Sequence, residues 1–599
     1  MQEKITAYYQ LKISEEESEL KKIRKILFNF YLLRLFTFLF FFVSLVLFFR
    51  SDNNWYFLFL SLLGFAAFLL FVKLDFKYAF REKFTSNKLL LNNNELRMLD
   101  HQFTDRETGS TYSHMNPHLA ADFDLFGNGS LFQYLNRCST LGGKLRLAEG
   151  LCQSRQNESI IKEKQQAIRE LAEKNEFVRD FQTHGMFITE KGNEVPGLQS
   201  WLDQPFEKSK LLPVLCILIP ILNICWLTMV IFGIFTLNSL LIPILLSLSI
   251  VGSHLKKINK AHHLLTKTAG TLKSYTTVIR LIETEEFLAG YFSLLKGKLS
   301  RNGMKAGDSL TSLFRLLNSF DLRLNLPVSI LLNTFLMYDI QIWLRLEKWK
   351  EKHKAVVSLW LDALSEFDSL TSLSVYAFNN QCTVSYPQVS EEVFTFQAVE
   401  MGHPLLHPST RICNSFELSG TPRIMIITGA NMAGKSTFLR TLSVNLILAM
   451  NGAPVCAKEF IFTPCDILSS IKIQDSLSSN ESYFYAELVR IREIIEHLKT
   501  NPRTLVVLDE ILRGTNTSDK QKGSRGLLEK LISLNAAVLI ATHDLSLGEL
   551  EKSHPNTIVN NCFEVELTND QLIFDYKLKK GISQKLNATY LMKKMGIIN

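Results

Sequence analysis

The chain has 599 residues, more than a single hydrophobic core organises, so we expect several structural units. Hydrophobic residues make up 47% of it and charged residues 21%; this charge excludes a chain buried throughout in lipid, while the apolar content is high for a soluble enzyme. Nine cysteines without a Cys-x-x-Cys pair argue against a disulfide framework or a zinc ribbon and favour reduced thiols in a cytosolic setting.

Two apolar stretches near the N-terminus predict a first pair of membrane spans. Residues 31–49 carry only Arg34 as a charge and residues 55–72 carry none, and each is close to the ~20 residues that cross a hydrocarbon layer. Both outer flanks are basic, which predicts a hairpin in residues 1–82 with its two ends on the cytoplasmic side. A cleaved signal peptide is disfavoured, because the first stretch starts late and a second one follows.

The next part of the chain has helical rather than membrane character. We expect residues 83–119 to be a cytoplasmic linker and residues 120–394 to form an α-helical core and lever region, since residues 160–178 and 342–374 show helical periodicity with charged surfaces. Asp122 and Asp124 could be metal ligands, but helix capping or a turn is the commoner use of such residues.

A second apolar stretch interrupts this helical region. Residues 211–251 contain no charge, are about twice the length of one span, and have a polar turn at residues 236–239, which predicts spans at 211–230 and 238–253. A buried pair of core helices is the disfavoured alternative. The apolar patch at residues 324–344 contains Pro327, Asn333 and Asp339, so we expect a core helix there. The sequence therefore predicts an integral protein of the inner (cytoplasmic) membrane with four spans and both termini cytoplasmic.

Basic residues concentrate just after the second hairpin. Residues 256–305 contain ten Lys or Arg against three Glu, a net charge of +7, which is most of the +8 of the whole chain. Such a segment could neutralise DNA phosphates, rest on anionic lipid headgroups, or be a solvated flank of the membrane hairpin. The three alternatives stay open at this point.

A nucleotide-binding motif lies in the C-terminal third. The β-rich run at residues 423–427 is followed by Gly429-Ala-Asn-Met-Ala-Gly434-Lys435-Ser436 and then by a helical pattern at residues 437–450. Glycines let successive N–H groups curl toward phosphate oxygens, and the following helix points its positive N-terminus at them. This pattern predicts a P-loop in which Lys435 pairs with the β- and γ-phosphates and Ser436 joins the Mg²⁺ shell.

Two further strand ends complete the predicted catalytic site. Residues 504–508 are a buried strand that ends in Asp509 and Glu510, which could hold the Mg²⁺ water shell and polarise the attacking water. A merely solvated acidic turn is the disfavoured alternative. The strand at residues 537–541 leads to His543, which could sense the γ-phosphate or be structural.

These segments together resemble the MutS mismatch-repair family. The resemblance rests on TGANMAGKSTFLR at residues 428–440, LDEILRGTNT at residues 508–517, ATH at residues 541–543 and GHP at residues 402–404. It implies a C-terminal α/β P-loop (ABC-type) ATPase domain at residues 395–599 that uses ATP and Mg²⁺. The residues implied in nucleotide binding are Gly429, Asn431, Met432, Ala433, Gly434, Lys435, Ser436 and Thr437.

The resemblance also implies a homodimer. In MutS-like ATPases a loop of the other subunit closes over each nucleotide, and Ser482 matches its trans-acting serine, although the family's Gly-Arg before it is Asn480-Glu481 here. The adenine position is implied at Arg411, Ile412 and Asn414, and a last helix would support the dimer. No N-terminal mismatch-reading module is recognisable; a membrane hairpin stands in its place.

Two functional hypotheses follow. The first is a membrane-anchored MutS-like ATPase that uses ATP to clamp DNA as a homodimer, in repair or recombination. The second is a membrane mechanochemical ATPase that acts on protein or lipid. A transporter is disfavoured, because four spans without intramembrane acids offer no pathway.

Overall fold

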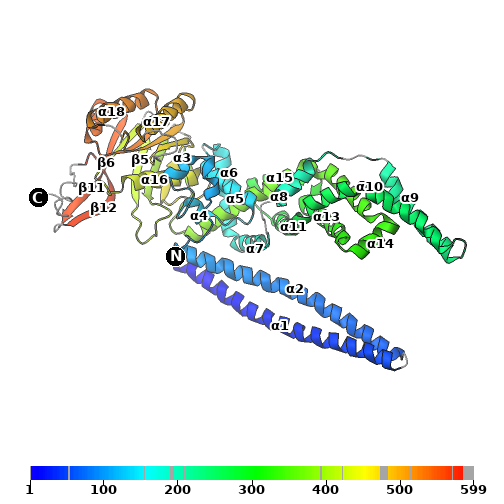
Figure 1. The fold of residues 1–599 in the computed structure, drawn as a ribbon. Helices are drawn as coiled ribbons and strands as arrows, with labels where there is room; N and C mark the ends of the chain where they lie inside the picture. Colours follow the sequence, from blue (N-terminus) through cyan, green and yellow to red (C-terminus); the bar gives the residue numbers. More distant parts are fainter. Residues whose placement is uncertain are drawn as a thin grey trace.

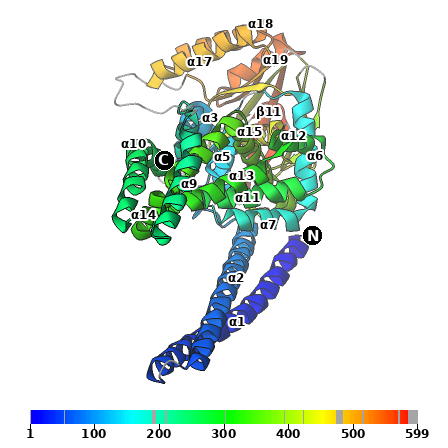
Figure 2. The same ribbon diagram turned by 90° about the vertical axis from the view of Figure 1, so that its right-hand side faces the viewer.

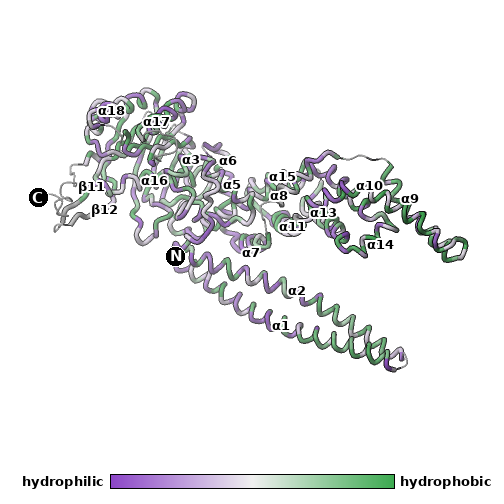
Figure 3. The backbone as a smooth tube through the Cα atoms, in the orientation of Figure 1, coloured by the Kyte–Doolittle hydropathy of each residue, from purple (hydrophilic) through white to green (hydrophobic). Residues whose placement is uncertain are grey.

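The structure is a computed structural model that describes residues 2–51, 54–153, 155–188, 194–206, 209, 211–301, 303–391, 394–420, 423–472, 483–512, 516–568 and 571–583. An α/β domain lies at one end of the molecule, a helical body lies in the middle, and two helical projections point away from the α/β domain (Figure 1). Both projections are most hydrophobic toward their far ends (Figure 3).

The first projection is an antiparallel pair of long helices, α1 (Gln2–Arg50) and α2 (Trp55–Leu99). Their 49 and 45 residues correspond to about 73 and 68 Å, more than twice a hydrocarbon layer of about 30 Å. The predicted spans occupy only the far halves, and the near halves form a charged stalk. The linker predicted at residues 83–119 is wrong for residues 83–99, which continue α2 because no Gly or Pro interrupts them.

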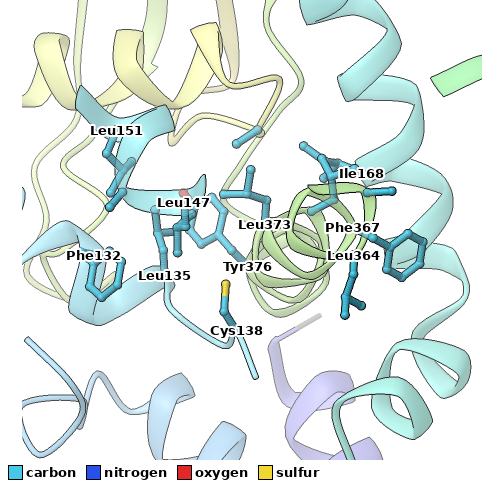
Figure 4. Packing of buried hydrophobic residues seen from close by; sticks show 14 of the residues in the cluster. Phe132, Leu135, Cys138, Leu147, Leu151, Ile168, Leu364, Phe367, Leu373 and Tyr376 are labelled. Atoms are coloured by element: carbon cyan, nitrogen blue, oxygen red, sulfur yellow. The ribbon is translucent and has the colours of Figure 1, made fainter. Parts of the chain in front are cut away.

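Helix α15 (Tyr338–Asn380) is the axis of the helical body. Around its C-terminal half, Leu364, Phe367, Leu373 and Tyr376 pack against residues of shorter helices, among them Leu147 and Ile168 (Figure 4). The short helices between the first and the second projection are η1 (Ser110–Met115), α3 (Pro117–Asp122), α4 (Leu131–Leu135), α5 (Leu141–Cys152), α6 (Glu158–Glu173), α7 (Asn175–Gly185) and α8 (Glu194–Asp203).

The second projection is built on α9 (Leu211–Ile231), η2 (Leu237–Leu240) and α10 (Leu241–Leu265), and leaves the body separately from the first (Figure 2). Four helices among the described residues are long and apolar enough to cross a membrane: α1, α2, α9, and η2 with α10 taken as one. They coincide with the predicted spans. The elements that follow are η3 (Thr266–Thr268), α11 (Ala269–Thr284), α12 (Gly290–Leu299), β1 (Ser300–Arg301), β2 (Met304–Lys305), α13 (Ala306–Phe320) and η4 (Asp321–Leu324).

The core helix predicted at residues 324–344 is wrong in its first half. Helix α14 (Leu326–Leu336) is a separate element that ends at Met337, whose φ is 49°, and the chain then bends by 81° into α15. The side-chain carbonyl of Asn333 accepts a hydrogen bond of 2.9 Å from the backbone N–H of Asp339, so a polar residue inside the apolar patch starts the new helix. The N-terminal half of α14 is exposed rather than packed in a core.

The α/β domain contains a six-stranded sheet in the order β12-β11-β6-β10-β9-β8. All neighbours pair in parallel except β11 and β12, which form an antiparallel hairpin. Strands β6 (Arg423–Gly429), β9 (Thr504–Asp509) and β10 (Ala537–Thr542) confirm the three strands predicted from the sequence. The others are β8 (Asp466–Ser470), β11 (Ile558–Thr568) and β12 (Gln571–Lys580).

A four-stranded sheet and several helices complete this domain. The smaller sheet has the order β3-β7-β4-β5, from β3 (Gln388–Val389), β4 (Thr395–Met401), β5 (Asn414–Ser419) and β7 (Glu459–Phe462). The helices are α16 (Lys435–Met450), α17 (Tyr483–Thr500), α18 (Thr517–Ser533), η5 (Leu545–Glu549) and α19 (Leu550–Ser553). Helix α16 confirms the helix predicted after the glycine-rich motif, and all nine cysteines, which lie in described parts of the chain, are free thiols.

Candidate functional site

The parallel register brings the predicted catalytic residues to one edge of the large sheet. Ala541 of β10 is level with Ile427 of β6 on one side and with Asp509 of β9 on the other. The glycine-rich loop, Glu510 and His543 each follow directly after these strands. Loops at the C-terminal ends of parallel strands form the ligand sites of such sheets, so this edge is the candidate site.

The loop between β6 and α16 has a backbone that other residue types would not adopt easily. Gly429, Met432 and Gly434 have φ values of 153°, 67° and 108°. A Cβ atom on Gly429 would lie 2.7 Å from the carbonyl oxygen of Phe563, so only glycine fits there. Asn431 and Met432 are exposed at the loop's crest, Ala433 is buried beneath it, and Ser436 and Thr437 follow in the first turn of α16.

Lys435 is buried at the start of α16 and is held by the loop itself. Its Nζ donates hydrogen bonds of 2.8 and 3.0 Å to the carbonyl oxygens of Gly429 and Ala430. The same Nζ lies 3.3 Å from Nε2 of His543. An ammonium beside a helix N-terminus attracts an anion such as a phosphate.

Two acids end β9 at the same edge. Asp509 is buried, and Glu510 follows it with a φ of 49°, held by a 2.9 Å hydrogen bond from its N–H to the carbonyl of Ala541. Oε1 of Glu510 lies 2.6 Å from Nε2 of His543. His543 thus lies between Glu510 and Lys435, in contact with both.

These residues fit a nucleoside triphosphate with its metal ion. The loop supplies a cradle that a Cβ would fill, Lys435 supplies a cation, and Ser436 and Asp509 offer the hydroxyl and carboxylate oxygens that Mg²⁺ prefers. A cavity of about 260 Å³ opens beside the loop, lined among others by His403, Ile412, Asn414, Thr437, Phe438 and Tyr576. Its mixed apolar and polar lining suits a nucleobase.

The predicted adenine contacts separate into two groups. Ile412 and Asn414 line the cavity, but Arg411 does not; it lines a neighbouring cavity, where its guanidinium donates to Sγ of Cys456. Tyr576 of β12 is a lining residue that sequence reasoning missed. Its carbonyl accepts a 3.0 Å hydrogen bond from Nδ2 of Asn414. The alternation of apolar and polar residues at 572–578 indicates a strand in the sequence, but it does not indicate which cavity the strand borders.

His403 is neutral in this cavity. Burial, with a smaller contribution from the guanidinium of Arg440, lowers the pKa of the His403 imidazole to about 4. The cavity therefore gains no positive charge from this side chain near neutral pH.

Of the helix cap or turn expected for Asp122 and Asp124, the turn is confirmed for Asp124, which lies in a turn directly after α3, whereas a capping role is wrong for Asp122. Its carboxylate accepts hydrogen bonds of 3.2 and 2.6 Å from the backbone N–H groups of Ile471 and Lys472, directly after β8. Asp124 pairs with Nζ of Lys472 at 2.7 Å and with Arg440 of α16 at 3.3 Å. Both acids therefore join the helical body to the α/β domain, and no group of three or more metal-binding side chains occurs within the described ranges.

Several predicted elements lie outside the described residues. These are Ser482 with Asn480 and Glu481, residues 513–515 of the LDEILRGTNT segment, and the last helix after Ser583.

The basic residues of the 256–305 segment are distributed over several elements. They lie on α10, η3, α11, α12 and the β1–β2 hairpin. Arg280 pairs with Asp308 at 2.9 Å, and Lys298 pairs with Asp362 at 2.8 Å. Lys256, Lys257 and Lys260 lie on α10 just past its apolar part, where a membrane flank would be basic.

Comparisons with known proteins agree with this geometry. Residues 425–597 match the family model of MutS domain V. The DNA mismatch repair protein MutS of Thermotoga maritima is 31% identical over 250 residues, which are 41% of this chain and 31% of that protein. MutS protein homolog 4 of Homo sapiens is 32% identical over 237 residues, 38% of this chain and 24% of that protein. The DNA mismatch repair protein MutS of Ehrlichia chaffeensis is 29% identical over 243 residues, 40% and 30% of the two chains.

The aligned region spans less than a third of each of these relatives. The matched part of this chain is the α/β domain with its glycine-rich loop, its paired acids and His543. On these matches residues 425–597 of this chain, which make up most of its α/β domain, are similar to MutS domain V.

Proposed function

We propose that the chain is a membrane-anchored ATPase related to the DNA mismatch repair proteins. The observation that carries this proposal is the contact of Glu510 with His543, and of His543 with Lys435, at the C-terminal edge of the parallel sheet. Proteins of the MutS family are ATPases, which supports the assignment of ATP and Mg²⁺ as ligands.

Each residue of the edge has a role in this proposal. Lys435 would bind the β- and γ-phosphates together with the N–H groups of residues 429–437, and Ser436 and Asp509 would hold Mg²⁺, which when bound neutralises phosphate charge. Glu510 orients and polarises the attacking water as general base. His543 holds the Glu510 carboxylate in place and links it to the lysine that senses the phosphates.

The nucleobase and the second subunit complete the proposed site. Ile412 and Tyr576 border the cavity proposed to bind the nucleobase, and Tyr576 offers an aromatic face for stacking on it. MutS-family proteins work as dimers, so in this proposal Ser482 of a second copy of this chain closes the nucleotide in trans.

Membrane anchoring is the second half of the proposal. Length, composition and basic flanks of α1–α2 and α9–α10 support four spans in the inner (cytoplasmic) membrane, with the α/β domain and both termini on the cytoplasmic side. The apolar ends of both projections point away from the α/β domain, which suits insertion in one bilayer (Figure 3).

Two partners for the ATPase cycle are supported by different observations. DNA is supported by the relatives, which are named as DNA mismatch repair proteins. A membrane protein or lipid is supported by α15, which contacts α9 through a 3.2 Å hydrogen bond from Gln341 to the carbonyl of Cys216 and reaches the α/β domain with its other end. Movement of the ATPase dimer would thus reach the second projection through one helix.

The ATPase rate of the full chain in nanodiscs, with and without homoduplex and mismatched DNA, separates these partners. Stimulation by DNA together with salt-sensitive DNA binding supports the clamp. ATP hydrolysis without stimulation by DNA and without salt-sensitive DNA binding overturns the hypothesis that DNA is the partner and favours a membrane protein or lipid.

A further inference from the structure

Helix α14 has an apolar surface that no part of the described chain covers. Its exposed fractions are 71% at Leu326, 54% at Ile330 and 60% at Leu331, and the preceding Leu324 is 69% exposed. At the other end of the helix Asn333 and Thr334 are buried against α9 and α10. Helix α14 lies beside α10 in both views of the fold (Figures 1 and 2).

Three hydrogen bonds locate the ends of this segment along α10. Before α14, Nη2 of Arg323 donates a hydrogen bond of 2.6 Å to Oδ1 of Asn259. At the end of α14, Nδ2 of Asn223 joins the carbonyl of Thr334 to Oγ of Ser247, each at 3.0 Å. Asn259 and Ser247 are twelve residues apart on one helix, which is about 18 Å along its axis.

Helix α14 therefore runs along α10 from its basic end, near Asn259, into its apolar part, near Ser247. Ser247 precedes Lys256 by nine residues on α10, which is about 14 Å along the helix axis. If Lys256 lies at the membrane surface, this distance is close to half of a hydrocarbon layer of about 30 Å. Asn223 gives the same depth independently, because it lies twelve residues from the start of α9 and eight from its end. Helix α14 itself has 11 residues, about 16 Å, too short to cross the layer.

The polar backbone at the break is satisfied within the protein. Nδ2 of Asn223 donates to the carbonyls of Thr334 and Phe335 at 3.0 and 3.2 Å, and Nε2 of Gln341 donates to the carbonyl of Leu336 at 2.8 Å. A helix may end at membrane depth only where such groups find protein partners. Arg323 pairs with Asp339 at 3.3 Å, and both side chains are nearly buried, so this charge pair is kept from lipid.

We propose that α14 is a re-entrant helix, which enters the hydrocarbon layer from the cytoplasmic side, ends near its middle and turns back into α15. The occupant of its exposed face is lipid acyl chain, because this face continues the apolar surface of α9 and α10. The inference rests on the membrane anchoring proposed above. It makes α15 a direct connection from the interior of the bilayer to the ATPase domain.

The test uses an environment-sensitive fluorophore on single cysteines of the full chain in nanodiscs. The background carries Cys225→Ser, Cys382→Ser and Cys413→Ser, since the other six cysteines are buried. The reporter variant is Leu331→Cys, with Ile221→Cys on α9 as the in-membrane control and Leu288→Cys, whose parent side chain is 96% exposed, as the aqueous control. Nitroxide-labelled lipids quench the fluorophore from the acyl-chain region.

The expected result is a blue-shifted emission at position 331 and loss of fluorescence with acyl-chain nitroxides, as at position 221 and unlike position 288. A Leu326→Cys reporter, nearer the cytoplasmic surface, is quenched more by shallow than by deep nitroxides, and Leu336→Cys the reverse. Quenching at 221 but not at 331 overturns the re-entrant helix and leaves the anchoring intact, including the case in which 331 is covered by a second copy. Absence of quenching at both positions overturns the anchoring itself.

Discussion

Replacing Glu510 with glutamine removes the general base and keeps the shape of the side chain. In the structure Oε1 of Glu510 lies 2.6 Å from Nε2 of His543, and the two side chains are 22% and 27% exposed. The amide oxygen of Glu510→Gln can still accept from His543, so the edge keeps its geometry. Loss of a general base costs about 10²- to 10⁴-fold in rate, or about 3–5 kcal/mol in the activation barrier.

The same change removes one negative charge beside the triphosphate, so ATP binding is retained or strengthened. The assay is steady-state phosphate release together with binding of a fluorescent ATP analogue, on protein in nanodiscs. Glu529→Gln is the matched control, because Glu529 is an exposed residue of α18 that pairs with Arg525 at 3.2 Å and does not line the nucleotide cavity. Phosphate release at the wild-type rate in Glu510→Gln would refute the assignment of the base.

Three further predictions concern the cavity and the membrane part. The His403 imidazole is neutral in the folded protein, with a pKa of about 4 against 6.5 in the unfolded chain, so the free energy of unfolding falls by about 3 kcal/mol as the pH drops from 6.5 to 4. In His403→Gln the melting temperature should depend less on pH over this range. An unchanged pH dependence would contradict the burial of His403. Asn223→Leu leaves the carbonyls of Thr334 and Phe335 without their donor and should lower the melting midpoint by the equivalent of about 1–2 kcal/mol, whereas Ile224→Leu on the same helix should not. A cysteine replacing Ser51, between α1 and α2, should react with an impermeant thiol reagent only from outside the cytoplasm, and labelling from the cytoplasmic side would reverse the first hairpin.

The strands of the α/β domain could be predicted from the sequence for a physical reason. Strands β6, β9 and β10 are central and parallel, so both faces are buried and the segments are uninterrupted apolar runs. Glycine-rich and acidic residues follow directly at the strand ends, and parallel pairing then brings them to one edge. Sequence alone therefore places Lys435, Asp509, Glu510 and His543 together.

Side-chain direction depends on neighbours that a linear pattern does not contain. Arg411 lies one residue before a cavity-lining position, but its guanidinium is drawn to Cys456, which is far along the chain. Tyr576 reaches the cavity only through the register of β12 against β11 and the hydrogen bond from Asn414. Asp122 looks like a capping residue until the end of β8 is placed beside it.

Apolar composition has a similar ambiguity. The residues of α14 suit a protein core and a lipid layer equally, and only the packing around Asn223 and the exposure of Ile330 and Leu331 separate the two. The extension of α2 to Leu99 is also hidden in the sequence pattern, because its end is stabilised from outside: Glu95, buried at this end, binds Arg137 and Asn379 of the helical body at 3.0 and 2.7 Å.

The most direct test of the account is ATP hydrolysis by the full chain in nanodiscs, compared between wild type and Lys435→Ala. Lys435 is the buried cation of the loop and contacts His543, so its removal should abolish nucleotide binding and hydrolysis while the protein still inserts in the membrane. The account predicts that the wild-type protein hydrolyses ATP and that the Lys435→Ala variant inserts normally in the membrane but is inactive. Equal hydrolysis by the two proteins, or none by the wild type, would contradict a MutS-type ATPase site in this chain.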